Sequence, residues 1–216
     1  MIKIENAEVM GWEQAIRGMR NPMNSWSKSD TKIEHISRPV FDIFETECIL
    51  GDNDLSLMKR LRKAGTDHRK FMRMITVYVD INAPLYWWKE FDTYKVGTVA
   101  NSCSTMHKIQ AKEFTLDDFS HEHLLGASKK AMADIIGELN FARIAYLETK
   151  NKDYWWQMIQ LLPSSYNQKR TVMLNYEVLA NMYKSRKHHK LDEWREFCKW
   201  IETLPYSELI TGEFND

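Results

Sequence analysis

The chain of 216 residues lacks the features that mark secreted, membrane-spanning and nucleic-acid-binding proteins. Its three cysteines, Cys48, Cys103 and Cys198, are odd in number and far apart, so they form neither a disulfide framework nor a zinc knuckle. Thirty basic side chains balance thirty acidic ones, which gives no reason to expect nucleic acid or an anionic membrane as a partner. No apolar run approaches the ~18 residues of a membrane-spanning helix, and residues 1–12 lack the apolar segment of a signal peptide. We therefore expect a reduced, cytoplasmic protein without a membrane or nucleic-acid partner.

Aromatic residues, in contrast, are plentiful: the sequence has eight tryptophans, nine tyrosines and nine phenylalanines. Aromatic rings bury a large area in a core, and they also stack on planar ligands. They are enriched at protein interfaces as well. An aromatic core with an oligomer interface is the more common explanation, and a ligand site stays open beside it.

Hydrophobic periodicity predicts one mixed, mostly helical domain over residues 1–216. The clearest helix covers 128–148, where Ile135, Leu139 and Ala142 follow helical spacing. The clearest strand covers 74–82, which is rich in β-branched residues. Further helices are predicted over 12–20, 153–161, about 170–185 and 190–203. Another runs from a cap at Asp52 or Asp54 to Gly65, and another from Pro84 to about Phe91.

A loop is predicted after the helix that ends near Phe91. The stretch 87–108 has little periodicity and many small polar side chains, and long loops in compact domains usually bind a ligand. Cys103 and His107 could act there as a thiolate and its base, but such a pair needs an electropositive setting and the same spacing occurs in many ordinary loops.

Two histidine pairs and one basic cluster are further candidates. His121-x-His123 and His188-His189 lack a third ligand at a recognised spacing, so we predict solvated surface and no metal. The cluster "KSRKHHK" at 184–190 stands at the end of a predicted helix. The helix dipole favours cations there for structural reasons alone, and a bound phosphate would explain the cluster equally well.

One segment resembles the signature of the flavin-dependent thymidylate synthase family. That family has a strand, a Pro-led helix and then Arg-His-Arg-x-x-Ser-x-Asn-Glu-x-Ser-x-Arg-Tyr. Here residues 93–98, "TYKVGT", stand where the motif begins, so Lys95 keeps a cation and Thr98 keeps a hydroxyl. Asn101 and Ser104 match the motif if one residue is inserted.

A second segment matches the family spacing over a longer stretch. Leu162-Pro163 is followed by Asn175, Asn181 and Arg186, and then by "HKLDEWR" from His189 to Arg195. "AIRGMR" near the N-terminus and "LRKAG" before "TDHRKF" also follow the family order, so the resemblance covers nearly the whole chain. At several positions this chain has a different residue from the family pattern. Thr93, Met106, Ile159 and Glu177 stand where the family has arginines that help hold flavin or nucleotide phosphate, Tyr94 stands where it has histidine, and Ser102 where it has glutamate.

The resemblance implies an α/β (α+β) fold, in which a small twisted antiparallel sheet is flanked by helices as in thymidylate synthase-complementing proteins. It also implies a homotetramer with FAD sites at subunit interfaces. The implied enzyme is a methyltransferase that converts dUMP to dTMP with methylenetetrahydrofolate as the one-carbon donor and NADPH as the reductant. The flavin does the hydride chemistry itself, so no catalytic side chain is required.

The resemblance assigns residues to two groups. Cofactor-binding candidates are His68, Lys95, Thr98, Asn175 and Asn181, and substrate-binding candidates are Glu90, Asn101, Ser102, Ser104 and Arg186. Two alternatives stay open. One is a related flavoenzyme that modifies another pyrimidine nucleotide, and the other is a catalytically inactive oligomer that binds flavin or nucleotide.

Overall fold

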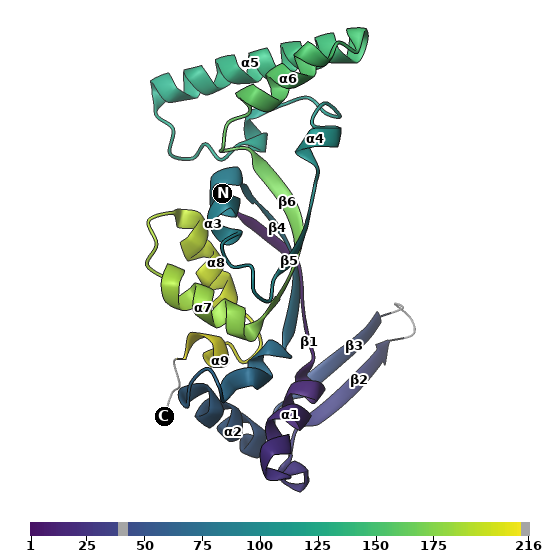
Figure 1. Cartoon of the computed structure of the whole chain (residues 1–216), viewed down its shortest axis with the longest axis vertical. Helices are drawn as coiled ribbons and strands as arrows, with labels where there is room; N and C mark the ends of the chain where they lie inside the picture. The colour runs from purple at the N-terminus through teal and green to yellow at the C-terminus, as the bar shows by residue number, and fades with distance from the viewer. Residues whose placement is uncertain (39–42, 213–216) are drawn as a thin grey trace.

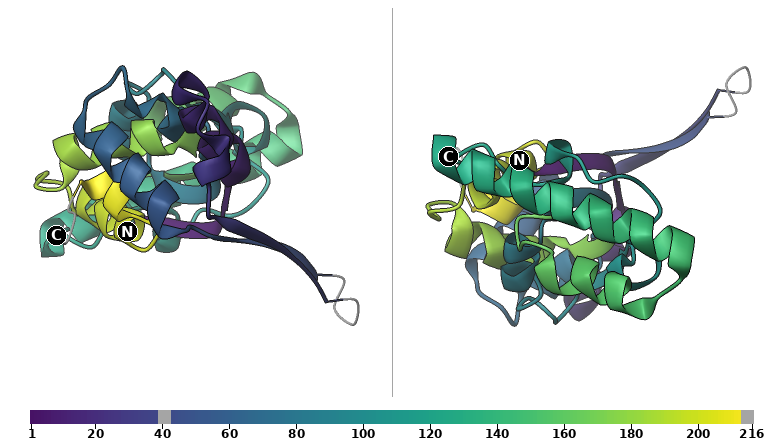
Figure 2. Two further views of the ribbon diagram at one scale, coloured as in Figure 1. Left: turned by 90° about the horizontal axis from the view of Figure 1, so that it is seen from below. Right: turned by 90° about the horizontal axis from the view of Figure 1, so that it is seen from above.

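The fold is built on an antiparallel sheet whose strands come from distant parts of the chain. The computed structural model describes residues 1–38 and 43–212, and within that part the sheet has the order β1-β4-β6-β5. Its strands are β1 (Lys3–Met10), β4 (Thr76–Pro84), β5 (Val99–Ser102) and β6 (Asn167–Asn175). A separate hairpin of β2 (Lys32–Arg38) and β3 (Ile43–Ile49) projects away from the body (Figures 1 and 2).

The two faces of the sheet differ in burial because side chains alternate along each strand. Val77, Val79 and Ile81 of β4 point to the inner face and are almost fully buried. Tyr78 lies between two of them on the outer face and is exposed. The apolar inner face therefore has to be covered by helices, whereas the polar outer face does not.

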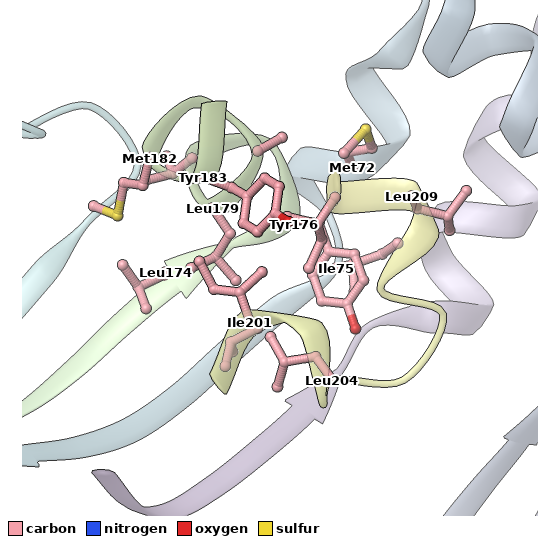
Figure 3. Packing of buried hydrophobic residues seen from close by; sticks show 14 of the residues in the cluster. Met72, Ile75, Leu174, Tyr176, Leu179, Met182, Tyr183, Ile201, Leu204 and Leu209 are labelled. Atoms are coloured by element: carbon pink, nitrogen blue, oxygen red, sulfur yellow. The ribbon is translucent and has the colours of Figure 1, made fainter. Parts of the chain in front are cut away.

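The helices that cover the inner face come from both ends of the chain. They are α1 (Trp12–Arg20), α2 (Asp52–Lys63), α3 (Leu85–Phe91), α7 (Tyr176–Arg186), α8 (Asp192–Glu202) and α9 (Glu208–Thr211), and the 3-10 helix η3 (Arg69–Arg73) joins them. Their apolar side chains and those of the strands form one core. Figure 3 shows Tyr176 and Leu179 of α7 packed against Ile201 and Leu204.

A second, smaller core lies beyond the end of the sheet. It belongs to α5 (Gly126–Thr149) and α6 (Lys152–Leu161), which lie side by side at the top of Figure 1, and to the loops that lead to them. These loops carry α4 (Thr105–Lys108) and the 3-10 helix η4 (Leu116–Asp118), and two further 3-10 helices, η1 (Asn21–Met23) and η2 (Trp26–Lys28), follow α1. On α5, Leu139 is buried against this core, while Phe141 and Ile144 are 62% and 51% exposed.

The structure confirms the predicted fold class and most of the predicted helices. The helix expected over about 170–185 is wrong in its first part, because β6 continues to Asn175 and α7 begins only at Tyr176. The predicted loop contains the short strand β5 and helix α4. The strands β1, β2 and β3 were not among the predicted elements.

The predicted cap of α2 is also wrong. Neither Asp52 nor Asp54 caps the helix, whose N-cap residue is Gly51. The carboxylate of Asp30 accepts hydrogen bonds from the backbone N–H groups of Asn53 and Asp54 at 3.0 and 3.1 Å. A residue more than twenty positions away in the chain thus satisfies the helix terminus. Within the described residues, no helix is long and apolar enough to cross a membrane.

Candidate functional site

A cluster of polar side chains surrounds Glu90 of α3, near the end of α7. Its Oε2 atom accepts hydrogen bonds from Arg186 Nη1 at 2.7 Å and from Trp194 Nε1 at 2.9 Å. His189 Nε2 lies 3.4 Å from the same oxygen. Among the described residues Oε1 has no hydrogen-bond partner, so one carboxylate oxygen of this Glu90–Arg186 cluster is available to a ligand.

Arg186 is held from several sides in this cluster. Its Nε donates to Tyr94 Oη at 3.0 Å, and its guanidinium lies 4.8 Å from the centre of the Trp194 ring. Arg186 therefore contributes to a partly buried network and does not serve as a cap of α7. Because a guanidinium has five N–H donors, the Nη2 group still has donors to offer an anion.

The loop after α3 connects this cluster to the start of α7. Gly97 has a φ of +80°, and a Cβ there would lie 2.7 Å from Asn175 Nδ2. The side-chain oxygen of Asn175 accepts from Val178 N at 3.0 Å and so caps α7. Thr98 donates its hydroxyl to the carbonyl of Tyr94, while Lys95 is exposed. Glycine at 97 is thus what allows the loop to lie directly against Asn175.

A second charged cluster joins η3 to α7. Arg69 Nε donates to Glu177 Oε1 at 3.2 Å, and Arg73 also pairs with this buried carboxylate. Burial raises the pKa of Glu177, but hydrogen bonds from Arg73 and Arg69 outweigh it and hold the pKa below its usual value. Arg69 Nη2 donates to Asn181 Oδ1 at 3.2 Å, and His68 is exposed at the start of η3.

The η3–α7 cluster supplies positive charge at a position where the family pattern has an arginine. Glu177 stands where the family pattern has an arginine between the two asparagines. The structure brings two guanidinium groups to the same place from η3, so the region beside Asn181 keeps a positive charge.

Three predicted residues lie on β5 and at the start of α4. Asn101 pairs with Thr171 and Ser102 with Arg170 in the β5–β6 ladder. Ser104 caps α4, because its hydroxyl oxygen accepts from His107 N at 3.1 Å. None of these three predicted residues has a hydrogen bond to Arg186 in the described structure.

Arg170 provides a cation next to this strand edge. Its Nη1 donates to Asp92 at 2.7 Å, and its guanidinium lies 4.2 Å from the centre of the Trp88 ring. Arg170, like Arg69 and Arg73, was not among the predicted site residues. The motif "TDHRKF" at residues 66–71 contains Arg69, but only contact with Glu177 shows that Arg69 and Arg73 face α7.

The remaining candidates make ordinary structural contacts in the described part of the chain. The described residues show no hydrogen bond between Cys103 and His107. His123 pairs with Asp192 at 3.1 Å, and His121 lies against the Phe119 carbonyl. Among the described residues, no group of three or more His, Cys, Asp or Glu side chains is arranged to hold a metal ion.

The arrangement defines an α+β protein with an antiparallel sheet, helices on its inner face and a separate helical pair. No family model and no curated protein sequence matches the chain. Its fold is nevertheless that of the flavin-dependent thymidylate synthases. The structure of flavin-dependent thymidylate synthase ThyX from Helicobacter pylori complexed with FAD and dUMP gives a TM-score of 0.67 at 16% identity, covering 99% of this chain and 100% of that chain.

Two further solved structures have the same fold. A second structure of ThyX from Helicobacter pylori, with FAD and dUMP, has a TM-score of 0.66 at 15% identity over 97% of this chain and 96% of that one. A UMP/dUMP methylase, PolB from Streptomyces cacaoi bound with 5-Br dUMP, has a TM-score of 0.59 at 12% identity over 98% and 95% of the two chains.

Proposed function

We propose that the protein is a flavin-dependent enzyme that methylates a pyrimidine nucleotide, with dUMP as substrate, methylenetetrahydrofolate as one-carbon donor and NADPH as reductant. The observation that carries this proposal is the match of the fold along essentially the whole chain to a protein complexed with FAD and dUMP. The clusters described above supply the polar groups that such ligands need.

The η3–α7 cluster fits the cofactor. The diphosphate of FAD needs cationic donors, and Arg69 and Arg73 bring two guanidiniums to one carboxylate, which leaves a net positive charge. Asn181 accepts a hydrogen bond from Arg69, and His68 directly precedes Arg69 in the chain. Lys95 and Thr98 lie on the loop with Gly97, which lies against Asn175 at the start of α7. Bound FAD supplies the hydride chemistry, so these residues need only hold it, orient it and exclude water.

The Glu90–Arg186 cluster fits the substrate. Arg186 offers its remaining N–H donors to the phosphate, and Glu90 Oε1 is available to accept from an N–H or hydroxyl group of the nucleotide. The pairing of Glu90 with Arg186 fixes both side chains before the ligand arrives, which reduces the entropy lost on binding.

We further propose a cytoplasmic homotetramer in which each site is shared between subunits. Asn101, Ser102 and Ser104 have no hydrogen bond to Arg186 among the described residues of one chain, and a shared site would let these residues of one subunit meet the nucleotide held by another. The exposed Phe141 and Ile144 on α5 form the kind of apolar surface that a second copy would cover.

A second candidate function follows from one of the structural neighbours. PolB is described as a UMP/dUMP methylase, so UMP is the alternative substrate for this chain. The third candidate is not an enzyme. Because several family arginines are replaced in this chain, it could bind flavin or nucleotide as an oligomer without catalysing a reaction.

The visible spectrum and a nucleotide titration test these proposals. The purified protein should contain or take up FAD, with absorbance near ~450 nm. In the flavin-loaded protein, Arg186→Ala should weaken dUMP binding about ten- to a hundredfold through loss of charge-assisted hydrogen bonds. Arg60→Ala, which removes an exposed arginine from α2, is the matched control and should leave the affinity unchanged.

Each outcome selects one candidate. Turnover of dUMP supports the first proposal, and turnover of UMP alone supports the second. Bound flavin without turnover of either nucleotide supports the inactive oligomer. A colourless protein that shows no flavin binding by calorimetry contradicts all three.

A further inference from the structure

A cavity of about 680 Å³ lies between α1, the segment that follows it and the base of the projecting hairpin. These elements lie together at the lower end of Figure 1. The volume is within the ~300–1,000 Å³ typical of small-molecule sites. The cavity shares no residue with the Glu90–Arg186 cluster or the η3–α7 cluster, so neither of these clusters accounts for it.

The floor of the cavity is fixed by a buried ion pair. Arg20 lines the cavity with only 4% of its side chain exposed, and its Nε donates to Asp54 Oδ1 at 2.6 Å. The hydroxyls of Ser29 and Thr31, which also line the cavity, each donate to Asp54 Oδ2 at 2.7 Å. Side chains held in this way cannot collapse into the space, so this part of the cavity is preformed.

Arg20 also keeps donors for a ligand. Its Nη1 donates to the carbonyl of Ser25 at 3.2 Å. Its Nη2 has no hydrogen-bond partner among the described residues. A buried guanidinium that lines a cavity with spare donors is suited to an anionic group, which can accept the bonds that the protein does not supply.

The rim provides a cation and an aromatic face. Arg17 lies on α1 one turn before Arg20 and makes no ion pair with any described residue. Trp26 is 50% exposed, and its Nε1 donates to Asn21 at 2.8 Å, which fixes the ring at the rim. Ile16 and Ile33 add apolar walls. Among the described residues that line the cavity, Glu13 is the one with an acidic side chain, and it can accept from an N–H group of a ligand.

We propose that this cavity is a binding site for a small, flat heteroaromatic compound that bears an anionic group. The ring packs against Trp26 and the two isoleucines, and the phosphate or carboxylate binds to Arg17 and the free donors of Arg20. Flat rings stack favourably on an indole, and arginine is the preferred partner of both kinds of anion.

Calorimetric titration of the full-length protein with named probes tests the site. AMP represents a ring with a phosphate, indole-3-propionate represents a ring with a carboxylate, and inorganic phosphate represents the anion alone. We expect saturable binding of AMP, indole-3-propionate or both, at one molecule per chain, and much weaker binding of inorganic phosphate. Arg17→Ala and Trp26→Ala should each weaken that binding about tenfold.

Three control variants locate the binding. Arg60→Ala and Trp156→Ala remove an exposed arginine and a tryptophan that is 42% exposed from other helices, and both should leave the affinity unchanged. Arg186→Ala should also leave it unchanged, which separates this site from the proposed nucleotide site. Thermal melting checks that the variants at Arg17 and Trp26 remain folded.

The same titrations test whether the site exists and identify the anionic group that it binds. Binding of AMP alone identifies phosphate as the anion, and binding of indole-3-propionate alone identifies carboxylate. Absence of saturable binding of both, equal affinity for inorganic phosphate, or binding that persists in folded Arg17→Ala and Trp26→Ala proteins would overturn the proposal.

Discussion

Replacing Glu177 by glutamine should change protein stability and flavin affinity in opposite directions. The substitution removes the negative charge between Arg69 and Arg73 but keeps the shape of the side chain. Glu177 is buried, and the 3.2 Å hydrogen bond from Arg69 is charge-assisted. Weakening such bonds next to two guanidiniums should lower the free energy of unfolding by about 1.5–3 kcal/mol.

The same change should strengthen FAD binding if the diphosphate lies beside η3. The substitution removes one negative charge from the cluster, and with partial screening the electrostatic gain for a nearby diphosphate is about 1 kcal/mol. That gain corresponds to roughly fivefold tighter binding. If Glu177 had only a structural role, the substitution would loosen the site and weaken FAD binding. The sign of the change in FAD affinity therefore distinguishes the two roles.

Urea denaturation and FAD titration on the same preparations measure both effects. Glu196→Gln, which breaks an exposed ion pair with Lys199 on α8, is the matched control and should change either quantity very little. Weaker FAD binding in Glu177→Gln, or unchanged binding despite the expected loss of stability, would show that the diphosphate does not lie at the η3–α7 cluster.

Three further predictions follow from contacts described above. Asp54→Asn should cost about 3–5 kcal/mol of unfolding free energy by urea titration, because it leaves buried Arg20 without a charge partner. Burial raises the pKa of Asp54, but hydrogen bonds from Ser29, Thr31 and Arg20 hold it below its usual value. The stabilisation by ionised Asp54 is therefore complete above the ordinary carboxyl pKa of about 3.9 and is lost as the pH falls below it. If the stability of Asp54→Asn fell with acid as steeply as that of the wild type, this explanation would be wrong. Gly97→Ala should destabilise by about 1–2 kcal/mol and weaken FAD binding, whereas Gly137→Ala, which meets open space on α5, should stabilise slightly in thermal melts. Light scattering should give a tetramer mass, and Ile144→Glu should lower it; a monomer mass for the wild type would contradict the shared sites.

The parts of the fold that could be predicted from sequence are those with a strong local signal. The helices α1, α5 and α6 have periodic apolar positions and clear ends, and β4 is rich in β-branched residues. Strand β6 was partly misread as helix, because its apolar residues run without a break into those of α7. Strand β5 has four exposed residues and no periodicity of its own, so only its pairing with β6 defines it as a strand.

The candidate site could be predicted only where residues from one segment act together. Asn175, Asn181 and Arg186 lie on or next to one helix, and their spacing was visible in the sequence. The pairing of Arg69 and Arg73 with Glu177 joins positions more than a hundred residues apart, and no local pattern reports such a contact. For the same reason no local pattern indicates that Asp54 binds Arg20 and the hydroxyls of Ser29 and Thr31.

The position of β4 in the sheet affects how the chain is synthesised. Thr76 of β4 pairs with Asn175 at the end of β6, and the helices that cover Val77, Val79 and Ile81 include α7 and α8. A nascent chain on the ribosome therefore displays the apolar face of β4 until nearly all of the protein has emerged. Non-local pairing of this kind is slow, and exposed strands aggregate. Expression of this protein should thus depend on chaperones that shield the N-terminal half during translation.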